Sequence, residues 1–149
     1  HDNFDPKISH VIPALILKFA KAKEQNLPSV EIWGTGNASR EFLHSHDCAR
    51  AINLAIEKDT DPLPINIGTG QEITIKHLAN LISEKMGYEG VVYFNEDYPD
   101  GQPRRCLSIS RAREILDFEP EVSLEYGIQE TVKWFEENKE QFVDYFDHI

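Results

Sequence analysis

The sequence predicts an α/β fold in which short strands are combined with several packed helices. Apolar residues recur at helical spacing along residues 12–19, 75–86 and 124–135, whereas residues 30–33 and 91–94 have the alternation or the β-branched composition of strands. At 149 residues, the chain has the length of one ordinary domain and can bury a core of its own.

The composition disfavours two classes of partner. Asp and Glu number 26 against 15 Lys and Arg, and the net charge of −11 argues against nucleic acid or an anionic membrane as the main partner. The sequence has no signal-peptide pattern and no apolar run of about 18 residues, and its only cysteines are Cys48 and Cys106. We therefore expect a cytoplasmic, reducing environment.

A helix is expected to begin near residues 10–12, after a loop of turn-forming residues at 1–9. Pro13 is tolerated only in the first turn, where its missing N–H is not needed. His10 therefore stands where the loop meets the helix, and its ordinary pKa near neutrality suits proton transfer in a neighbouring cleft. A capping or surface histidine is the alternative. Because the chain starts with His1 and a polar run, we also expect it to be a piece of a longer protein.

The stretch 33–47 contains the main candidate for anion binding. A strand at 30–33 leads into a turn at 34–36, where two glycines permit backbone angles that other residues resist. Arg40 follows, before a second extended run at 42–43, and its planar guanidinium suits a phosphate or a carboxylate. The alternative is a hairpin in which Arg40 is a surface ion-pair partner.

The histidines that follow Arg40 do not predict a metal site. His44 and His46 are two positions apart, so they do not share a helical face, and no third His or Cys follows at a useful spacing. Asp47 is instead expected to cap a helix that runs from Cys48 to about Lys58.

A glycine-containing turn at 68–70 follows an expected turn at 59–64 and a predicted strand at 65–67. Such a turn after a strand is a weak indication of phosphate binding. It lacks the third glycine of a dinucleotide fingerprint and the Gly-Lys-Thr of a P-loop.

The rest of the chain alternates between helices and extended segments. The predicted N-caps of its three helices are Thr74, Ser110 and Ser123. Gly87 is expected to end the first of these helices, and residues 91–94 are predicted to form a strand. In the loop 95–105, prolines lower the entropic cost of holding Arg104 and Arg105 toward a ligand, although a solvated basic pair is equally consistent with the pattern.

Motifs along nearly the whole chain resemble the C-terminal half of extended short-chain dehydrogenase/reductases, the NAD-dependent epimerases and dehydratases of nucleotide sugars. The motifs shared by many of these enzymes are Trp-Gly-Thr-Gly at 33–36, Arg-Glu-Phe at 40–42 and Asn-Ile-Gly-Thr-Gly at 66–70. The motifs similar to the fucose-forming branch are Asp-Asn-Phe at 2–4, Ser-His-Val-Ile-Pro at 9–13 and Pro-Asp-Gly-Gln-Pro-Arg at 99–104. The resemblance implies a substrate-binding domain over residues 1–149 with the Rossmann core largely missing.

The resemblance also implies roles for five residues. His10 matches a proton donor and acceptor in epimerisation beside a 4-keto group, Lys18, Arg40 and Arg105 match cations of the GDP-sugar site, and Trp33 matches a residue of the same pocket. The family usually has Arg at position 18 and Lys at position 105. The charge is kept at both positions, while the bidentate geometry changes.

The implied reaction is the epimerisation of GDP-4-keto-6-deoxy-mannose at C3 and C5 followed by reduction with NADPH, in a homodimeric parent enzyme. The NADP-binding fingerprint and the Tyr-x-x-x-Lys pair would precede His1, so we expect no cofactor-binding residue in this chain and no activity from it alone. One alternative is an epimerase or dehydratase of another nucleotide sugar. The other is a stand-alone binding module that docks through Phe142, Tyr145 and Phe146.

Overall fold

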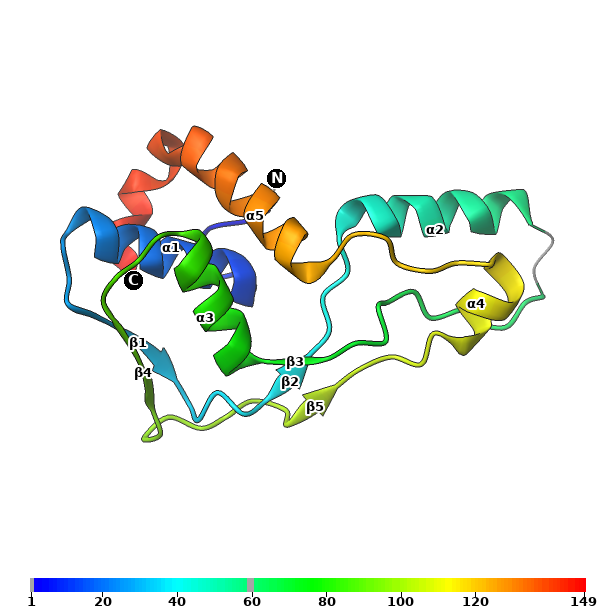
Figure 1. The fold of residues 1–149 in the computed structure, drawn as a ribbon, viewed down its shortest axis with the longest axis horizontal. Helices are drawn as coiled ribbons and strands as arrows, with labels where there is room; N and C mark the ends of the chain where they lie inside the picture. The colour runs from blue at the N-terminus through cyan, green and yellow to red at the C-terminus, as the bar shows by residue number, and fades with distance from the viewer. Residues whose placement is uncertain (1, 59–60) are drawn as a thin grey trace.

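The computed structural model describes residues 2–58 and 61–149, which form two lobes joined by short strands. Figure 1 shows helices α1 (Val11–Glu24), α3 (Ile75–Lys85) and α5 (Leu124–Glu137) at one end of an elongated molecule, with α2 (Ser45–Glu57) and α4 (Ser110–Leu116) at the other end. The turn expected at 59–64 lies partly outside the described residues. The fold is the predicted mixture of helices and short strands.

The main lobe consists of helices packed around an aromatic-rich core. Its helices are α1 (Val11–Glu24), α3 (Ile75–Lys85), α5 (Leu124–Glu137) and the 3-10 helix η1 (Lys139–His148). The predicted apolar faces of α1, α3 and α5 supply most of the buried side chains. Phe4, from the N-terminal loop, is 1% exposed and ties this loop to the helical core.

The prediction of a C-terminal docking patch is wrong. The Phe146 side chain is buried, and Phe142 and Tyr145 are partly buried against the main core. The Phe142 ring lies 4.8 Å from the Phe4 ring and 5.5 Å from the Phe135 ring. These aromatic residues stabilise the helical lobe, so they do not support a stand-alone docking module.

Strand β1 (Ser29–Trp33) confirms the predicted extended run, but its partner is not its neighbour in sequence. It pairs in parallel with β4 (Val91–Asn95), and Trp33 lies opposite Asn95. The hairpin alternative is therefore wrong. A parallel pair requires a long crossover, and here β2 (Ser39–Arg40), α2 (Ser45–Glu57), β3 (Ile73–Thr74) and α3 intervene between the two strands.

Three two-residue strands form the sheet between the lobes. Strand β2 (Ser39–Arg40) lies between β3 (Ile73–Thr74), which is antiparallel to it, and β5 (Arg104–Arg105), which is parallel to it. In this register Arg40 is opposite Arg105. Because side chains alternate between the faces of a sheet, these two arginines share one face.

The second lobe consists of α2 (Ser45–Glu57), α4 (Ser110–Leu116) and the segments that connect them. Its buried apolar side chains are Ala51, Ile109, Ala112, Leu116 and Phe118. Residues 65–67 pack against this cluster but do not form the predicted strand. Among the described residues, no other strand pairs with this segment.

Two of the predicted helix caps are confirmed. The Thr74 side chain accepts a hydrogen bond from the His77 N–H at 3.1 Å, and the Ser123 side chain accepts one from the Tyr126 N–H at 3.2 Å. The residue that ends α3 is also as predicted, since Gly87 has a φ of 61°.

The other two caps differ from the prediction. Helix α2 begins at Ser45, and its N-cap is His44, whose Nδ1 accepts from the His46 N–H at 3.3 Å. Helix α4 begins at Ser110 itself, with Ile109 as its N-cap. Asp47 is therefore not a cap, although its type and position resemble one.

Asp47 instead connects the second lobe to the segment that leads into α5. Its buried carboxylate accepts hydrogen bonds from the N–H of Val122 at 2.9 Å and of Glu121 at 3.0 Å, and it pairs with Arg50 at 2.9 Å. Burial alone would raise the pKa of Asp47, but the Val122 N–H, the Arg50 guanidinium and the Glu121 N–H together lower it.

We expect Asp47→Asn to lower the free energy of unfolding by about 1–3 kcal/mol at pH 7, because an amide replaces the charged acceptor of these hydrogen bonds. The folded-state pKa of Asp47 is below its unfolded value, so its contribution is present above about pH 4 and is lost as the pH falls through the folded pKa. Urea unfolding at several pH values measures this. The exposed Asp144 supplies the control Asp144→Asn, and equal stability of the two variants at pH 7 would contradict the assignment.

Candidate functional site

Two cavities divide the five predicted site residues between them. His10, Arg40 and Arg105 border one of about 650 Å³, here named the arginine pocket. Lys18 and Trp33 border another of about 670 Å³, here named the tryptophan pocket. Both volumes are in the range of small-molecule sites. The two pockets share no lining residue, so the structure does not join all five residues in one cavity.

The arginine pocket has two guanidinium groups on neighbouring strands. The register of β2 and β5 sets Arg40 beside Arg105, and Nη1 of Arg40 donates to the Ser39 carbonyl at 2.6 Å. Within residues 2–58 and 61–149, no carboxylate forms an ion pair with Arg40 or Arg105. Both side chains are therefore available to an anionic ligand.

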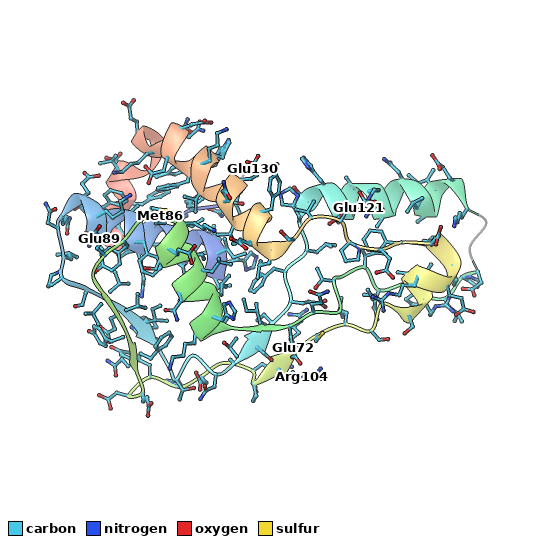
Figure 2. The ribbon with its side chains drawn as sticks, viewed as in Figure 1. Glu72, Met86, Glu89, Arg104, Glu121 and Glu130 are labelled. Atoms are coloured by element: carbon cyan, nitrogen blue, oxygen red, sulfur yellow. The ribbon has the colours of Figure 1, made fainter. Side chains whose placement is uncertain are left out.

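Arg104 has a different role from its neighbour Arg105. Its Nε donates to the two carboxylate oxygens of Glu72 at 2.9 and 3.0 Å, and Figure 2 shows the two residues side by side. The Ser39 hydroxyl and the Arg104 guanidinium both lower the pKa of Glu72. The alternative of a surface basic residue thus fits Arg104, whose ion pair with Glu72 stabilises the sheet. Arg105 instead borders the arginine pocket.

Glu41 fixes the wall of the arginine pocket, and the sequence analysis missed it. Its carboxylate accepts hydrogen bonds from the N–H groups of Thr69 at 3.0 Å, Gly70 at 2.8 Å and Leu107 at 2.6 Å. A Cβ on Gly68 would lie 2.8 Å from the same carboxylate, so this close approach requires glycine. The signal available in the sequence was an acid directly after Arg40 together with a distant glycine-containing turn.

These hydrogen bonds also explain the turn at 68–70. The amides of Thr69 and Gly70, which could have bound a phosphate, are already engaged by Glu41. The turn therefore contributes to the position of the pocket wall. The weak indication of phosphate binding by its backbone is not supported.

His10 lies at the mouth of the arginine pocket. It stands where the N-terminal loop meets α1, as the sequence predicted, and although it is the N-cap residue, its side chain makes no capping hydrogen bond. The side chain is exposed and borders the pocket together with Pro13 and Asp2. This position is compatible with proton transfer to or from a ligand in the pocket.

The tryptophan pocket combines a cation with aromatic rings. Nζ of Lys18 lies 5.4 Å from the centroid of the Trp33 ring and donates to the Glu31 carbonyl at 3.1 Å. Burial lowers the pKa of Lys18, and the charge of Glu31 opposes this shift. The Trp33 ring is 62% exposed and stacks on Tyr98 with a centroid distance of 4.6 Å. Tyr98 is the second residue that the sequence analysis missed.

The loop 95–105 is fixed to the turn after β1. The Asp100 carboxylate accepts from the Thr35 N–H at 2.9 Å and from the Thr35 hydroxyl at 2.5 Å. Gly34 has a φ of 83°, and a Cβ there would lie 2.3 Å from the Asp100 carboxylate. The loop is therefore held by Asp100, whose carboxylate can approach the turn this closely only because Gly34 has no Cβ.

Two kinds of site are not found in the described part of the chain. No group of three or more His, Cys, Asp or Glu residues there could hold a metal ion. No helix in it has the length and apolar character needed to span a membrane.

Comparison with known proteins connects this geometry to one enzyme family. Residues 1–68 match the model of the NAD dependent epimerase/dehydratase family. Over 95% of its length the chain is 45% identical to GDP-L-fucose synthase of Escherichia coli (strain K12), and over 92% it is 42% identical to probable GDP-L-fucose synthase 1 of Oryza sativa subsp. japonica. It covers 47% and 42% of these relatives, so it spans about half of their length.

The fold is similar to that of a solved member of the same group. A crystal structure of a GDP-L-fucose synthetase from Naegleria fowleri superposes with a TM-score of 0.87 at 30% identity, covering 94% of this chain and 43% of that one. A structure of that protein bound to NADP gives the same TM-score. The shared motifs and the shared fold show that the chain belongs to the extended short-chain dehydrogenase/reductases, the NAD dependent epimerase/dehydratase family.

Proposed function

We propose that this chain is the GDP-sugar-binding part of a GDP-L-fucose synthase. The observation that carries the proposal is the pair Arg40 and Arg105, two guanidinium groups in register, without carboxylate partners among the described residues, in one cavity with His10. Two adjacent unpaired guanidiniums match the charge of a pyrophosphate. The identity to curated GDP-L-fucose synthases supports the choice of substrate.

In this proposal the arginines hold the pyrophosphate, and His10 moves a proton on one face of the sugar. Epimerisation at C3 and C5 removes the proton beside a ketone and returns one to the opposite face, so it needs a group on each side of the ring. His10 would be one of these groups. The other lies outside residues 1–149, as do the groups that reduce the ketone.

The glycine-containing turn at 68–70 does not fit the pyrophosphate of NADP. The amides of Thr69 and Gly70 are taken by Glu41, and the glycine turn lacks the third glycine of a dinucleotide fingerprint. We therefore propose that the enzyme is longer than this chain and that another domain binds NADP and supplies the hydride chemistry. As the family resemblance implies, the longer enzyme would be a homodimer.

An uncovered apolar face on the second lobe supports a further domain. On α2, Ile52 is 53% exposed and Ile56 is 77% exposed, and Leu63 beside the lobe is 60% exposed. Ile52 and Ile56 are one helical turn apart, so they share a face of α2, and exposed apolar side chains grouped in this way are typical of a contact surface. The segment 65–67 also lacks a strand partner in the described chain, which a neighbouring sheet would supply.

We expect Arg40→Ala and Arg105→Ala each to weaken binding of GDP to this chain by about 1.5–3 kcal/mol, because each removes a charge-assisted hydrogen bond. Arg40→Lys should recover part of the loss. Titration calorimetry with GDP, UDP and dTDP measures the affinities and also separates a GDP-sugar enzyme from one for another nucleotide. Arg113→Ala, on an exposed arginine paired with Glu119, is the control. If Arg40→Ala binds as Arg113→Ala does, the phosphate site is elsewhere.

We expect His10→Asn, in the enzyme that includes the NADP-binding domain, to lower epimerisation by roughly 10²–10⁴-fold, since it removes a positioned acid or base. Reduction of the unepimerised ketone should survive better, because it depends on other residues. Solvent deuterium incorporation at C3 and C5 measures the first step, and product analysis with NADPH measures the second. The exposed His77 on α3 provides the control His77→Asn. Unchanged deuterium exchange would exclude His10 from the chemistry, and equal loss of both steps would assign it to substrate positioning.

A further inference from the structure

We propose that Tyr98 binds the nucleobase, by forming with Trp33 a preformed two-ring platform on which the base stacks. This inference rests on the proposed function and adds to it a residue that sets affinity for the base. The two rings are stacked and nearly parallel, with 11° between their planes, and both border the tryptophan pocket.

The exposure of the two rings indicates a role in binding. Trp33 is 62% exposed and Tyr98 is 42% exposed, and neither belongs to the buried clusters of the two lobes. Leaving this much aromatic surface in water forgoes the stabilisation that burial would give. A planar ligand that covers the rings recovers it.

The platform is held in place by hydrogen bonds on both sides of Tyr98. Before it, the Asn95 carbonyl accepts from the N–H of Gly34 at 2.9 Å and from the N–H of Tyr98 at 3.4 Å. After it, Asp100 accepts from Thr35. The two rings therefore come from segments that are fixed to each other, which lowers the entropic cost of adding a third ring to the stack.

The loop that carries Tyr98 also connects the two pockets. It continues to Gly101, where a Cβ would lie 3.6 Å from Nη2 of Arg40. Gly101 is three residues after Tyr98, so their Cα atoms are at most about 11 Å apart. One nucleoside diphosphate can cover this distance. The base can thus stack at Tyr98 while the phosphates meet Arg40 and Arg105.

Lys18 supplies a charge at the same platform. Its ammonium is half-buried over the Trp33 ring and is held by the Glu31 carbonyl. A cation beside a stack favours a ligand that carries both an aromatic ring and an anionic group. Both features together distinguish a nucleotide from an uncharged aromatic compound.

The test compares GDP, UDP and inorganic pyrophosphate as probes, with titration calorimetry on this chain. Tyr98→Ala should weaken GDP binding roughly 5- to 100-fold, the range for loss of one base-stacking side chain. UDP should lose less because its ring is smaller, and pyrophosphate should lose nothing. Tyr98→Phe keeps the ring and should bind GDP as the unsubstituted chain does. Tyr126→Ala, at a 55% exposed tyrosine on α5, is the control.

Three outcomes would overturn the inference. If Tyr98→Ala binds GDP as well as or better than the unsubstituted chain does, the Tyr98 ring packs on Trp33 without contributing to base binding. An equal loss for pyrophosphate would mean that the substitution disturbs the arginine pocket. In either case, GDP binding that still depends on Arg40 leaves the proposed function standing. If the unsubstituted chain binds neither GDP nor pyrophosphate, both proposals fail.

Discussion

The arginine pocket depends on one carboxylate, that of Glu41. Strand β5 contains only two residues, so its ladder with β2 alone holds Arg105 weakly. The hydrogen bond from the Leu107 N–H to Glu41 further fixes the backbone that follows Arg105. The same carboxylate binds the turn at 68–70, and hydrogen bonds to an ionised acceptor are stronger than neutral ones. Glu41 thereby fixes two distant segments against the strand that carries Arg40.

The contacts of the acids around the site explain how a protein with a net charge of −11 can keep two arginines without carboxylate partners in one pocket of the described chain. Glu41 and Asp100 are occupied by backbone N–H groups, and Glu72 is occupied by Arg104 and Ser39. Each of these three acids thus has a partner other than Arg40 or Arg105. The overall charge disfavours polyanions in solution, while the local arrangement leaves two guanidiniums for a small ligand.

The helices could be predicted from the sequence because a period of 3.6 residues and local caps such as Thr74 are visible within one segment. The strand partners could not, since β1 meets a strand about 60 residues away and two-residue strands carry no periodicity. Asp47 was wrongly predicted to be a helix cap, because Asp is common both as an N-cap and as a buried carboxylate that binds backbone N–H groups. Local pattern already proposed His10, Arg40 and Arg105 as site residues, and the family resemblance added Lys18 and Trp33. Glu41 and Tyr98 were missed because their contacts join segments that are far apart in the sequence, which no local pattern records.

The two guanidiniums in register also impose a cost that a ligand can remove. Arg40 and Arg105 carry like charges on adjacent strands, and no carboxylate in the described chain neutralises them. Like charges opposite each other destabilise a strand pair, so the short β2–β5 ladder is weaker when the pocket holds no anion. A ligand that binds only the folded chain stabilises it by mass action, and a dianion also removes this repulsion. Under the proposed function, ligand binding and the order of β5 would therefore be coupled, because Arg105 belongs both to the proposed anion site and to the two-residue strand β5.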